Sequence, residues 1–516
     1  MHLKEKKYQI AVTIILAIGM LIRLIDIDKL PNAVNVDEIS SGYEAYSILN
    51  YGIDRNGNFM PAFLVAWGGG QNALLTYLII PFFKIFGPSI FSIRLPMAIL
   101  GCISLCIIYS LFKKIGNKKI ALVGLIFFAI CPWHIMKSRW GLESNLFPDL
   151  ILIFIYLLIK GLEEKRIWYY LSFVIAGLSA YSYGTSYFFL PVFIIPTLYI
   201  LIKKKKITLK EAILGLGITA IVAMPIILYV IVNTFNLQQI NLPFVTIPKL
   251  EVNRYKEITS IFSKDFINNS ISNLKEGFKV ILYQNDNLPW NTLNNYGIIY
   301  MFSIIFTVIG IINEFKKNKW MDIKYNFIFN ICFIVSIILM IICEPNINRI
   351  NVMWIPIIYY TIIGIYIIIN IDKSYIIPIA IIYAIFFMLF LANYEKENFD
   401  IYGTFEGNIE DPIKYVKNIE NKEIYITNQI KEPYIYVLFY NQYNPKDYID
   451  TVEYYNKGEE FEQVKSFGKY HFEPIKSIEN PKDNIYIINK EDINKYNITN
   501  EWNTVEFEKY FVLEGI

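Results

Sequence analysis

Residues 8–25 read YQIAVTIILAIGMLIRLI, after which the chain turns polar and reads Asn35-Val36-Asp37-Glu38. The first stretch has about the length that an α-helix needs to cross the hydrocarbon core of a bilayer, which takes roughly 20 apolar residues. Similar runs recur along the 516 residues, of which 55% are hydrophobic. A soluble protein of this size would bury a core without such repeated runs. The sequence therefore predicts a mainly α-helical, polytopic membrane protein.

The lysines and arginines between the apolar runs predict how the chain is oriented. Clusters such as Lys203–Lys206 fall in connections assigned to the cytoplasm, whereas the three short outer loops hold only Lys137, Arg139 and Arg349. Cytoplasmic loops carry an excess of such residues, so we expect the N-terminus inside the cell membrane and the C-terminus outside. Eleven spans are predicted, at residues 8–25, 91–112, 119–136, 145–160, 168–183, 187–202, 211–232, 296–314, 325–343, 350–370 and 374–393.

Two features near the start of the chain need a separate interpretation. Residues 72–86 are apolar but too short to span, and they contain Pro81 and Lys84. We expect a helix that lies in or dips into the membrane interface. Arg23 lies inside the first apolar run. It is interpreted as a residue whose charge reaches the interface, with a substrate contact as the alternative.

Two domains are expected. Residues 1–393 form the transmembrane domain, with a first outer loop at 26–90 and a long outer loop at 233–295. Residues 394–516 lose the apolar runs, and we expect a small extracytoplasmic α/β domain there. Its predicted strands are 423–427, 434–440 and 484–488, with a helix near 412–419. The net charge of +3 gives no indication of a nucleic-acid partner.

Asp37 and Glu38 are the first candidates for chemistry. They begin a segment that can form an amphipathic helix to Tyr51, with Tyr43 on it as a possible substrate contact. One interpretation is a helix start, because acidic residues in the first turn favour the positive end of the helix dipole. The other is catalysis: a carboxylate takes the proton of an attacking hydroxyl, as a general base. The second carboxylate then orients the first or helps bind a divalent metal, and no other cofactor is indicated.

Four more charged residues lie at the outer ends of predicted spans. Arg139 and Glu143 are four apart, so they are either an exposed helical pair or ligands for a phosphate and a sugar hydroxyl. Arg349 either contacts lipid headgroups or grips a lipid phosphate, because its planar fork matches phosphate oxygens. Arg94 is open to the same two interpretations. His134 fits an interface residue better than a ligand.

Several motifs, taken in order, resemble the first outer loop and later segments of the protein O-mannosyltransferase and aminoarabinose transferase group. The resemblance covers roughly residues 8–370 and implies the GT-C membrane fold. It also implies transfer of a sugar from a polyprenyl-phosphate donor with inversion, with Asp37 as catalytic base. The motifs are Val36-Asp37-Glu38, Gly42-Tyr43, Gly52-Ile53-Asp54, Pro81, Arg94-Leu95-Pro96, Pro132-Trp133-His134, Ser138 to Glu143, Tyr181-Ser182-Tyr183, Asn348-Arg349 and Pro356.

The chain departs from that pattern at two positions. Ser40 stands where aminoarabinose transferases carry an arginine, and Gln71-Asn72-Ala73 stands where they carry lysine-proline-proline. Those residues contact the lipid phosphate in the relatives, so phosphate binding here is expected to shift to Arg139 and Arg349. The sugar is left open, hexose or pentose alike.

The sequence thus predicts an integral-membrane inverting glycosyltransferase of the cell envelope. The donor is a polyprenyl-phosphate sugar, and the acceptor is a glycan, a lipid or a protein. Two alternatives belong to other classes: a lipid-linked sugar transporter or flippase, and a non-catalytic envelope assembly protein. A transporter would place charged residues in mid-span. If the membrane part catalyses the reaction, deletion of 394–516 should leave activity measurable.

Overall fold

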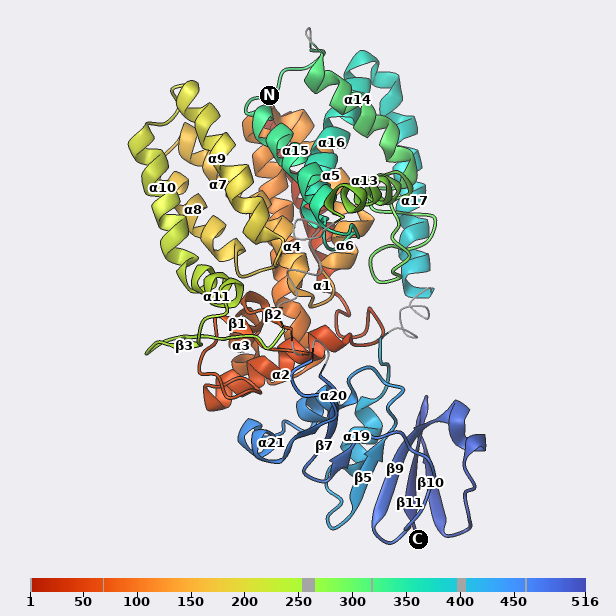
Figure 1. The fold of residues 1–516 in the computed structure, drawn as a ribbon. Helices are drawn as coiled ribbons and strands as arrows, with labels where there is room; N and C mark the ends of the chain where they lie inside the picture. Colours follow the sequence, from red (N-terminus) through yellow and green to blue (C-terminus); the bar gives the residue numbers. More distant parts are fainter. Residues whose placement is uncertain (1, 68, 253–264, 317–318, 397–404, 460–461) are drawn as a thin grey trace. The chain divides into compact units, whose positions relative to one another are not determined.

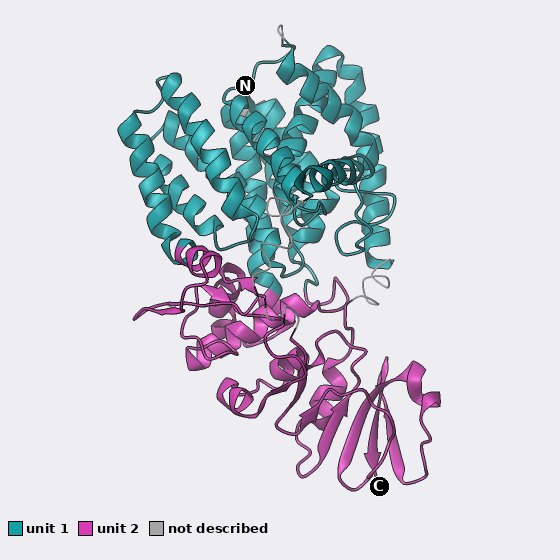
Figure 2. Ribbon diagram, in the orientation of Figure 1, with its two compact units in different colours: residues 1–27, 94–227, 255–397 teal, residues 28–93, 228–254, 398–516 magenta. Residues whose placement is uncertain are grey.

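The computed structural model describes residues 2–516 apart from 68, 253–264, 317–318, 397–404 and 460–461 (Figure 1). The chain forms two compact units (Figure 2). Unit 1 comprises residues 1–27, 94–227 and 255–397. Unit 2 comprises residues 28–93, 228–254 and 398–516, so most of the first loop groups with the C-terminal segment. Parts of the predicted loop 233–295 and the start of the predicted domain 394–516 lie outside the described residues.

Unit 1 is built from helices. Most are rich in Ile, Leu and Phe and form the apolar runs that the sequence predicts. Their bounds are α1 (His2–Leu24), α4 (Ile90–Ile115), α5 (Lys118–Ala129), α6 (Pro132–Lys137), α7 (Leu146–Glu163), α8 (Arg166–Ser179), α9 (Ser186–Lys203), α10 (Leu209–Val222), α11 (Met224–Thr234, which runs into unit 2), α13 (Phe266–Tyr283), α14 (Ile304–Phe315), α15 (Asn326–Ile342), α16 (Trp354–Ile371) and α17 (Ile376–Lys396).

Helices lie at all the predicted spans, but some are too short to cross a bilayer alone. Among the described residues, six helical stretches have the length and composition of a span, or seven if the bent pair α10–α11 is one span. The shorter helices include α5, α8, α14 and α15. The chain is therefore a multi-pass membrane protein. The six stretches are Glu5–Leu24, Ile90–Ile115, Glu143–Glu163, Ser186–Lys203, Asn351–Ile371 and Lys373–Lys396.

Prolines explain why two predicted spans are broken. The predicted span 119–136 is divided into α5 and α6, because Pro132 lacks the N–H that would continue the first helix. Pro132 instead occupies the first position of α6, where that N–H is not needed. The span predicted at 211–232 bends by 67° between α10 and α11, next to Pro225.

Unit 2 begins with two helices from the first loop. α2 (Val36–Tyr51) follows the predicted amphipathic segment, and α3 (Leu74–Phe86) follows the predicted interfacial helix. Between them lies a short hairpin of β1 (Phe63–Leu64) and β2 (Gln71–Asn72), in which Phe63 pairs with Asn72. A second hairpin, β3 (Ile240–Asn241) with β4 (Thr246–Ile247), comes from the long loop and contacts the first loop through a bridge between Pro61 and Thr246.

The C-terminal part of unit 2 forms a seven-stranded sheet in the order β10-β11-β9-β5-β8-β7-β6. β5 is parallel to both β8 and β9, and the other neighbours are antiparallel. The predicted α/β character of this region is confirmed. Its elements are α19 (Glu410–Val416), β5 (Glu423–Ile426), α20 (Pro433–Tyr440), α21 (Pro445–Thr451), β6 (Glu453–Tyr454), β7 (Val464–Phe467), β8 (Tyr470–His471), β9 (Asn484–Asn489), β10 (Trp502–Glu506) and β11 (Tyr510–Gly515).

The strand predicted at 434–440 is wrong, because this segment is helix α20. Its residues favour strands by type, but Pro433 at the first helical position fixes a helical start. All of Tyr434–Tyr440 are buried, which a helix packed on several sides achieves as readily as a central strand. The unbroken apolar run at 434–440 therefore did not distinguish a buried helix from a central strand.

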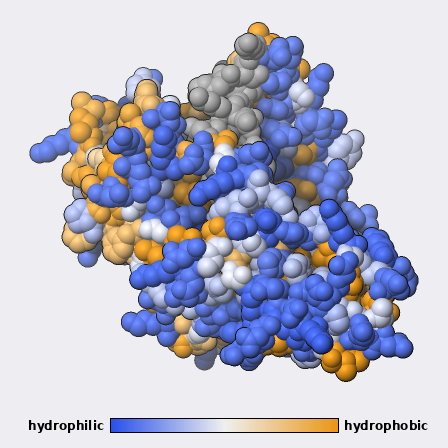
Figure 3. All heavy atoms as spheres, turned by 60° about the horizontal axis from the view of Figure 1, so that its bottom comes forward, coloured by the Kyte–Doolittle hydropathy of each residue, from blue (hydrophilic) through white to orange (hydrophobic). Residues whose placement is uncertain are grey.

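The exposed side chains differ between the membrane helices and the C-terminal end of the molecule. α17 exposes large apolar side chains around its length, which need an apolar environment. When the C-terminal end of the molecule is turned forward, most of the visible face is hydrophilic (Figure 3). The exposed apolar side chains of α17 are Ile376, Ile377, Ile381, Ile382, Ile385, Met388 and Leu389.

Candidate active site

The start of α2 divides the Asp37–Glu38 pair into two roles. Asn35 caps the helix: its Oδ1 accepts a hydrogen bond of 2.8 Å from the Asp37 N–H. Glu38 is buried and completes the capping box, since its Oε2 accepts 3.2 Å from the Asn35 N–H. The helix-start interpretation therefore describes Glu38. The Asp37 carboxylate takes no part in these two capping bonds.

Gln71 contacts the Asp37 carboxylate directly. Its Nε2 donates a hydrogen bond of 3.2 Å to Asp37 Oδ1, and the β1–β2 pairing fixes the Gln71 backbone. This bond restricts the orientation of the carboxylate. Gln71 Oε1 is buried without a hydrogen-bond partner among the described residues. One of the two positions that depart from the family pattern is thus next to the candidate base.

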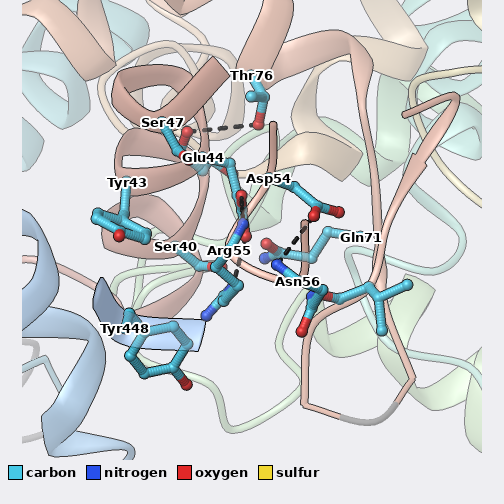
Figure 4. Close-up of polar contacts among 12 residues, drawn as sticks. Ser40, Tyr43, Glu44, Ser47, Asp54, Arg55, Asn56, Gln71, Thr76 and Tyr448 are labelled. Carbon is cyan, nitrogen blue, oxygen red and sulfur yellow. Dashed lines mark hydrogen bonds and ion pairs between the residues drawn. The ribbon is translucent and has the colours of Figure 1, made fainter. Parts of the chain in front are cut away.

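Ser40, the other departing position, lies in a buried polar cluster that the sequence analysis missed (Figure 4). Arg55 forms an ion pair with Glu44, with Arg55 Nε 2.5 Å from Glu44 Oε1. Its Nη2 donates to Ser40 Oγ, and its Nη1 donates to the Tyr434 hydroxyl at 3.2 Å. The guanidinium also lies 5.0 Å from the centre of the Trp67 ring. The spacing of Asp37, Ser40 and Glu44, three and four apart, was a sequence signal for one helical face.

Burial changes the titration of several carboxyls in unit 2. It raises the pKa of Asp54 to about 7, with the nearby Glu44 adding to the effect. It raises the pKa of Glu432 to about 7, although Arg55 and Lys431 oppose the change. The pKa of Glu44 is also raised by burial, against the attraction of Arg55. Asp54 is held by the N–H groups of Asn56 and Asn58, at 2.9 and 2.8 Å from its Oδ1.

Tyr43 is buried, and its hydroxyl donates a hydrogen bond of 3.0 Å to the Tyr443 carbonyl. Its predicted contact with substrate stays a prediction. Among the described residues, no group of three or more His, Cys, Asp or Glu side chains is arranged to hold a metal ion.

In unit 1, Arg139 and Arg94 hold the end of α1 and the residues after it. Arg139 Nη1 donates to the Ile22 carbonyl, and its Nη2 donates to those of Ile25 and Asp26 at 2.8 and 3.2 Å. Arg94 Nη1 donates to the Ile27 carbonyl at 2.9 Å. These cations satisfy carbonyls that a helix end leaves without partners.

Glu143 departs from the helical pair that the sequence offered, and Arg349 has an ion-pair partner. Glu143 begins a short 3-10 turn, and no helix joins it to Arg139. The two are therefore not a pair on one helical face. Arg349 forms an ion pair with Glu344 at 2.7 Å, and the Glu344 side chain is 77% exposed. Of the two predicted phosphate-binding arginines, Arg349 thus has the more exposed partner, which water can replace more readily.

Arg23 does not reach the interface; that interpretation is wrong. The side chain is fully buried and donates to the carbonyls of Gly19, Phe128 and Ala129 and to His134 Nδ1. His134 is buried as well, with Nε2 3.2 Å from Asp149 Oδ1. Lys137 Nζ lies 2.5 Å from Asp149 Oδ2. An apolar run can hold a charge internally when polar partners are available, and this run has them.

Comparison with known proteins finds one family model and several solved structures that resemble this chain. Residues 72–229 match the model of the family described as dolichyl-phosphate-mannose-protein mannosyltransferase. The matched segment contains Arg94, Arg139 and Glu143 but ends before Arg349 and begins after Asp37. No curated protein matches the chain.

Two solved structures share the fold at low sequence identity. One is ArnT from Cupriavidus metallidurans bound to undecaprenyl phosphate, with a TM-score of 0.57, 9% identity and 97% of each chain covered. The other is the oligosaccharyltransferase AglB from Archaeoglobus fulgidus in complex with an inhibitory peptide and a dolichol-phosphate. That match has a TM-score of 0.50 and 12% identity, and it covers 85% of this chain and 64% of the other. These matches confirm the resemblance to polyprenyl-phosphate-dependent glycosyltransferases of the GT-C fold.

Proposed function

We propose that this protein transfers a sugar from a polyprenyl-phosphate donor to an acceptor hydroxyl on the extracytoplasmic face of the cell membrane. Asp37 takes the proton of the acceptor hydroxyl, and the hydroxyl oxygen attacks the anomeric carbon from the face opposite the phosphate. The bond from that carbon to the phosphate oxygen breaks, the lipid phosphate leaves, and the anomeric configuration inverts. The acceptor is a glycan, a lipid or a protein, and the sugar is a hexose or a pentose.

The observation that carries the proposal is that the two carboxylates at the start of α2 have different surroundings. Glu38 closes the helix cap, whereas Asp37 is half-buried and oriented by the Gln71 amide. A fixed carboxylate within reach of a hydroxyl is what general base catalysis needs. The family match and the two similar structures, each with a bound lipid phosphate, support the donor class.

For the donor phosphate, the contacts favour Arg349 over Arg139. Arg349 can leave its exposed Glu344 partner at small cost, because exposed ion pairs contribute roughly 0–1 kcal/mol. Arg139 would first have to leave carbonyls at the end of α1. Glu143 and Arg94 remain candidates for contacts with the sugar and the lipid.

The test is transfer from a radiolabelled polyprenyl-phosphate sugar by the wild type and by Asp37→Asn. Loss of the base should lower the transfer rate by about 10²–10⁴-fold. The matched control is Asp28→Asn, which makes the same change at an exposed position of the same loop and should keep wild-type activity. Full activity in Asp37→Asn would rule out this base.

The transporter alternative gains little from the buried charges of unit 1. Arg23, His134, Lys137 and Asp149 are each bound to protein partners and fully or nearly fully buried. A transport path would need charged groups facing water.

A further inference from the structure

The helix that carries Asp37 is held by the C-terminal part of the chain, within unit 2. α2 packs against α3 from its own loop and against α20, which comes nearly 400 residues later. A Cβ on Gly42 would lie 3.1 Å from the Phe439 ring and 2.4 Å from the Ile93 side chain. The two helices therefore approach closely where α2 carries no side chain.

Three tyrosine hydroxyls connect the two regions. The Tyr436 hydroxyl donates to the Val34 carbonyl at 3.2 Å, directly before the capping residue Asn35. The Tyr46 hydroxyl donates to the Gln442 carbonyl at 2.9 Å, beside the bond from Tyr43 described above. Val34 also forms a β-bridge with Glu406. These contacts fix both the start and the middle of α2.

Arg55 adds a connection through side chains. Its fork reaches Ser40 and Glu44, one helical turn apart on α2, and also Tyr434 on α20. Because a guanidinium is planar and presents its donors in fixed directions, these three bonds set the rotation of α2 about its own axis. Asp37 lies one turn before Ser40, so this rotation also sets where its carboxylate points.

We infer that the C-terminal region (Phe405 to Ile516) positions α2 through α20 and the residues after it to Tyr443, and that Arg55 is a positioning residue for Asp37. The inference rests on the proposed function, in which Asp37 is the base. From the sequence, activity was expected to remain measurable after deletion of 394–516. The inference reverses this expectation, so removal of the C-terminal region should abolish transfer. If transfer persists, the region is an appended domain that does not position the active site.

The first experiment compares two double variants of the full-length protein. Tyr46→Phe with Tyr434→Phe removes two hydroxyls and keeps the packed rings: one joins α2 to the Gln442 carbonyl, and the other joins α20 to Arg55. Tyr415→Phe with Tyr496→Phe removes two hydroxyls whose partners, Glu514 and Ile475, lie within the C-terminal region. The first variant should lower kcat about tenfold, comparable to losing one hydrogen bond from the reacting arrangement, with the donor KM unchanged. The second should keep wild-type kcat.

A readout independent of activity accompanies the kinetics. Amide hydrogen exchange of α2 should be faster in Tyr46→Phe with Tyr434→Phe than in the wild type, and unchanged in the control. Unchanged exchange, or faster exchange with an unchanged kcat, would overturn the inference. The proposed function fails separately, if Asp37→Asn keeps full activity.

A conservative change separates positioning from charge balance. Arg55→Lys keeps a positive charge opposite Glu44 but cannot reach Ser40 and Tyr434 at the same time. It should retain the wild-type melting temperature and lose kcat. Wild-type kcat in this variant would show that Arg55 only neutralises Glu44, and would overturn its positioning role.

Discussion

Two buried guanidinium groups, Arg23 in unit 1 and Arg55 in unit 2, donate their hydrogen bonds to different kinds of acceptor. Arg23 donates mainly to backbone carbonyls, which any sequence provides at a helix end. Arg55 donates to the side chains of Glu44, Ser40 and Tyr434, which must be these residue types. The first arrangement stabilises a fold, and the second makes two distant segments depend on each other's identity. Substitutions should therefore reduce stability in unit 1 and activity in unit 2.

The largest effect is expected where the charge network of unit 1 is broken. Asp149→Leu leaves Lys137 buried without its carboxylate and His134 without its partner, and loss of one partner of a buried pair costs about 3–5 kcal/mol. The melting temperature in detergent should fall sharply. The control Glu5→Gln removes the carboxylate of the exposed pair with Lys118 and should change the melting temperature little. A small change in Asp149→Leu would contradict the comparison.

The carboxyls of unit 2 should make its stability depend on pH. Burial raises the pKa of Asp54 from its ordinary 3.8 to about 7, so the folded protein keeps a proton that the unfolded chain loses. This stabilising contribution is complete below pH 3.8 and is lost as the pH rises through about 7. Glu432, with a pKa of about 7, acts in the same direction.

Asp54→Asn isolates this contribution, because an amide oxygen can still accept from Asn56 and Asn58. The melting temperature of this variant, relative to that of the wild type, should increase as the pH is raised from 5 to 8. Asp28→Asn, at an exposed position of the same loop, should follow the wild-type curve. Parallel curves for Asp54→Asn and the wild type would show that Asp54 is ionised in the folded protein.

Two matched helix caps sharpen the contrast between the units. Asn35 caps α2 and Thr208 caps α10, each in a capping box with a glutamate. Replacing either by alanine should cost about 1 kcal/mol of stability. Only Asn35→Ala should also lower the transfer rate, because α2 carries Asp37. Equal transfer rates in the two variants would show that the cap at Asn35 does not affect catalysis.

The smallest effect on stability is expected at Arg349. Its pair with Glu344 is exposed on the glutamate side, so Arg349→Gln should change stability by less than about 1 kcal/mol. If Arg349 binds the donor phosphate, the donor KM rises severalfold in this variant while Glu344→Gln keeps the wild-type KM. An unchanged KM in both would remove Arg349 from the site.

Local patterns predicted much of this molecule. The order Asn35, Asp37, Glu38 marks a helix start, and the apolar runs mark the membrane helices, because both signals lie within a few turns of chain. The break at Pro132 and the bend at Pro225 were available from the same rules. The number of spans was less secure, since a run of apolar residues fixes neither the end of a helix nor its tilt.

What the sequence did not predict depends on contacts between distant segments. Glu44 is an ordinary residue of helix α2 and Arg55 an ordinary loop residue until the turn at 54–58 folds back onto α2. The carbonyl partners of Arg139 near Ile25 are more than a hundred residues away, so no local pattern indicated them, and its contact with a phosphate stays a prediction. The helix at Tyr434–Tyr440 was taken for a strand because its burial on several sides comes from elements that no local pattern reveals.

The contacts of α2 also bear on how the protein is made. α2 is translated long before α20 and its tyrosines, which lie nearly 400 residues further along the chain. A ribosome-bound chain thus has the candidate base long before it has Tyr436 and Tyr434 to hold it. If the protein has the proposed function, the growing chain would sit in the membrane without transferring sugar, and activity would begin when α20 folds onto the first loop.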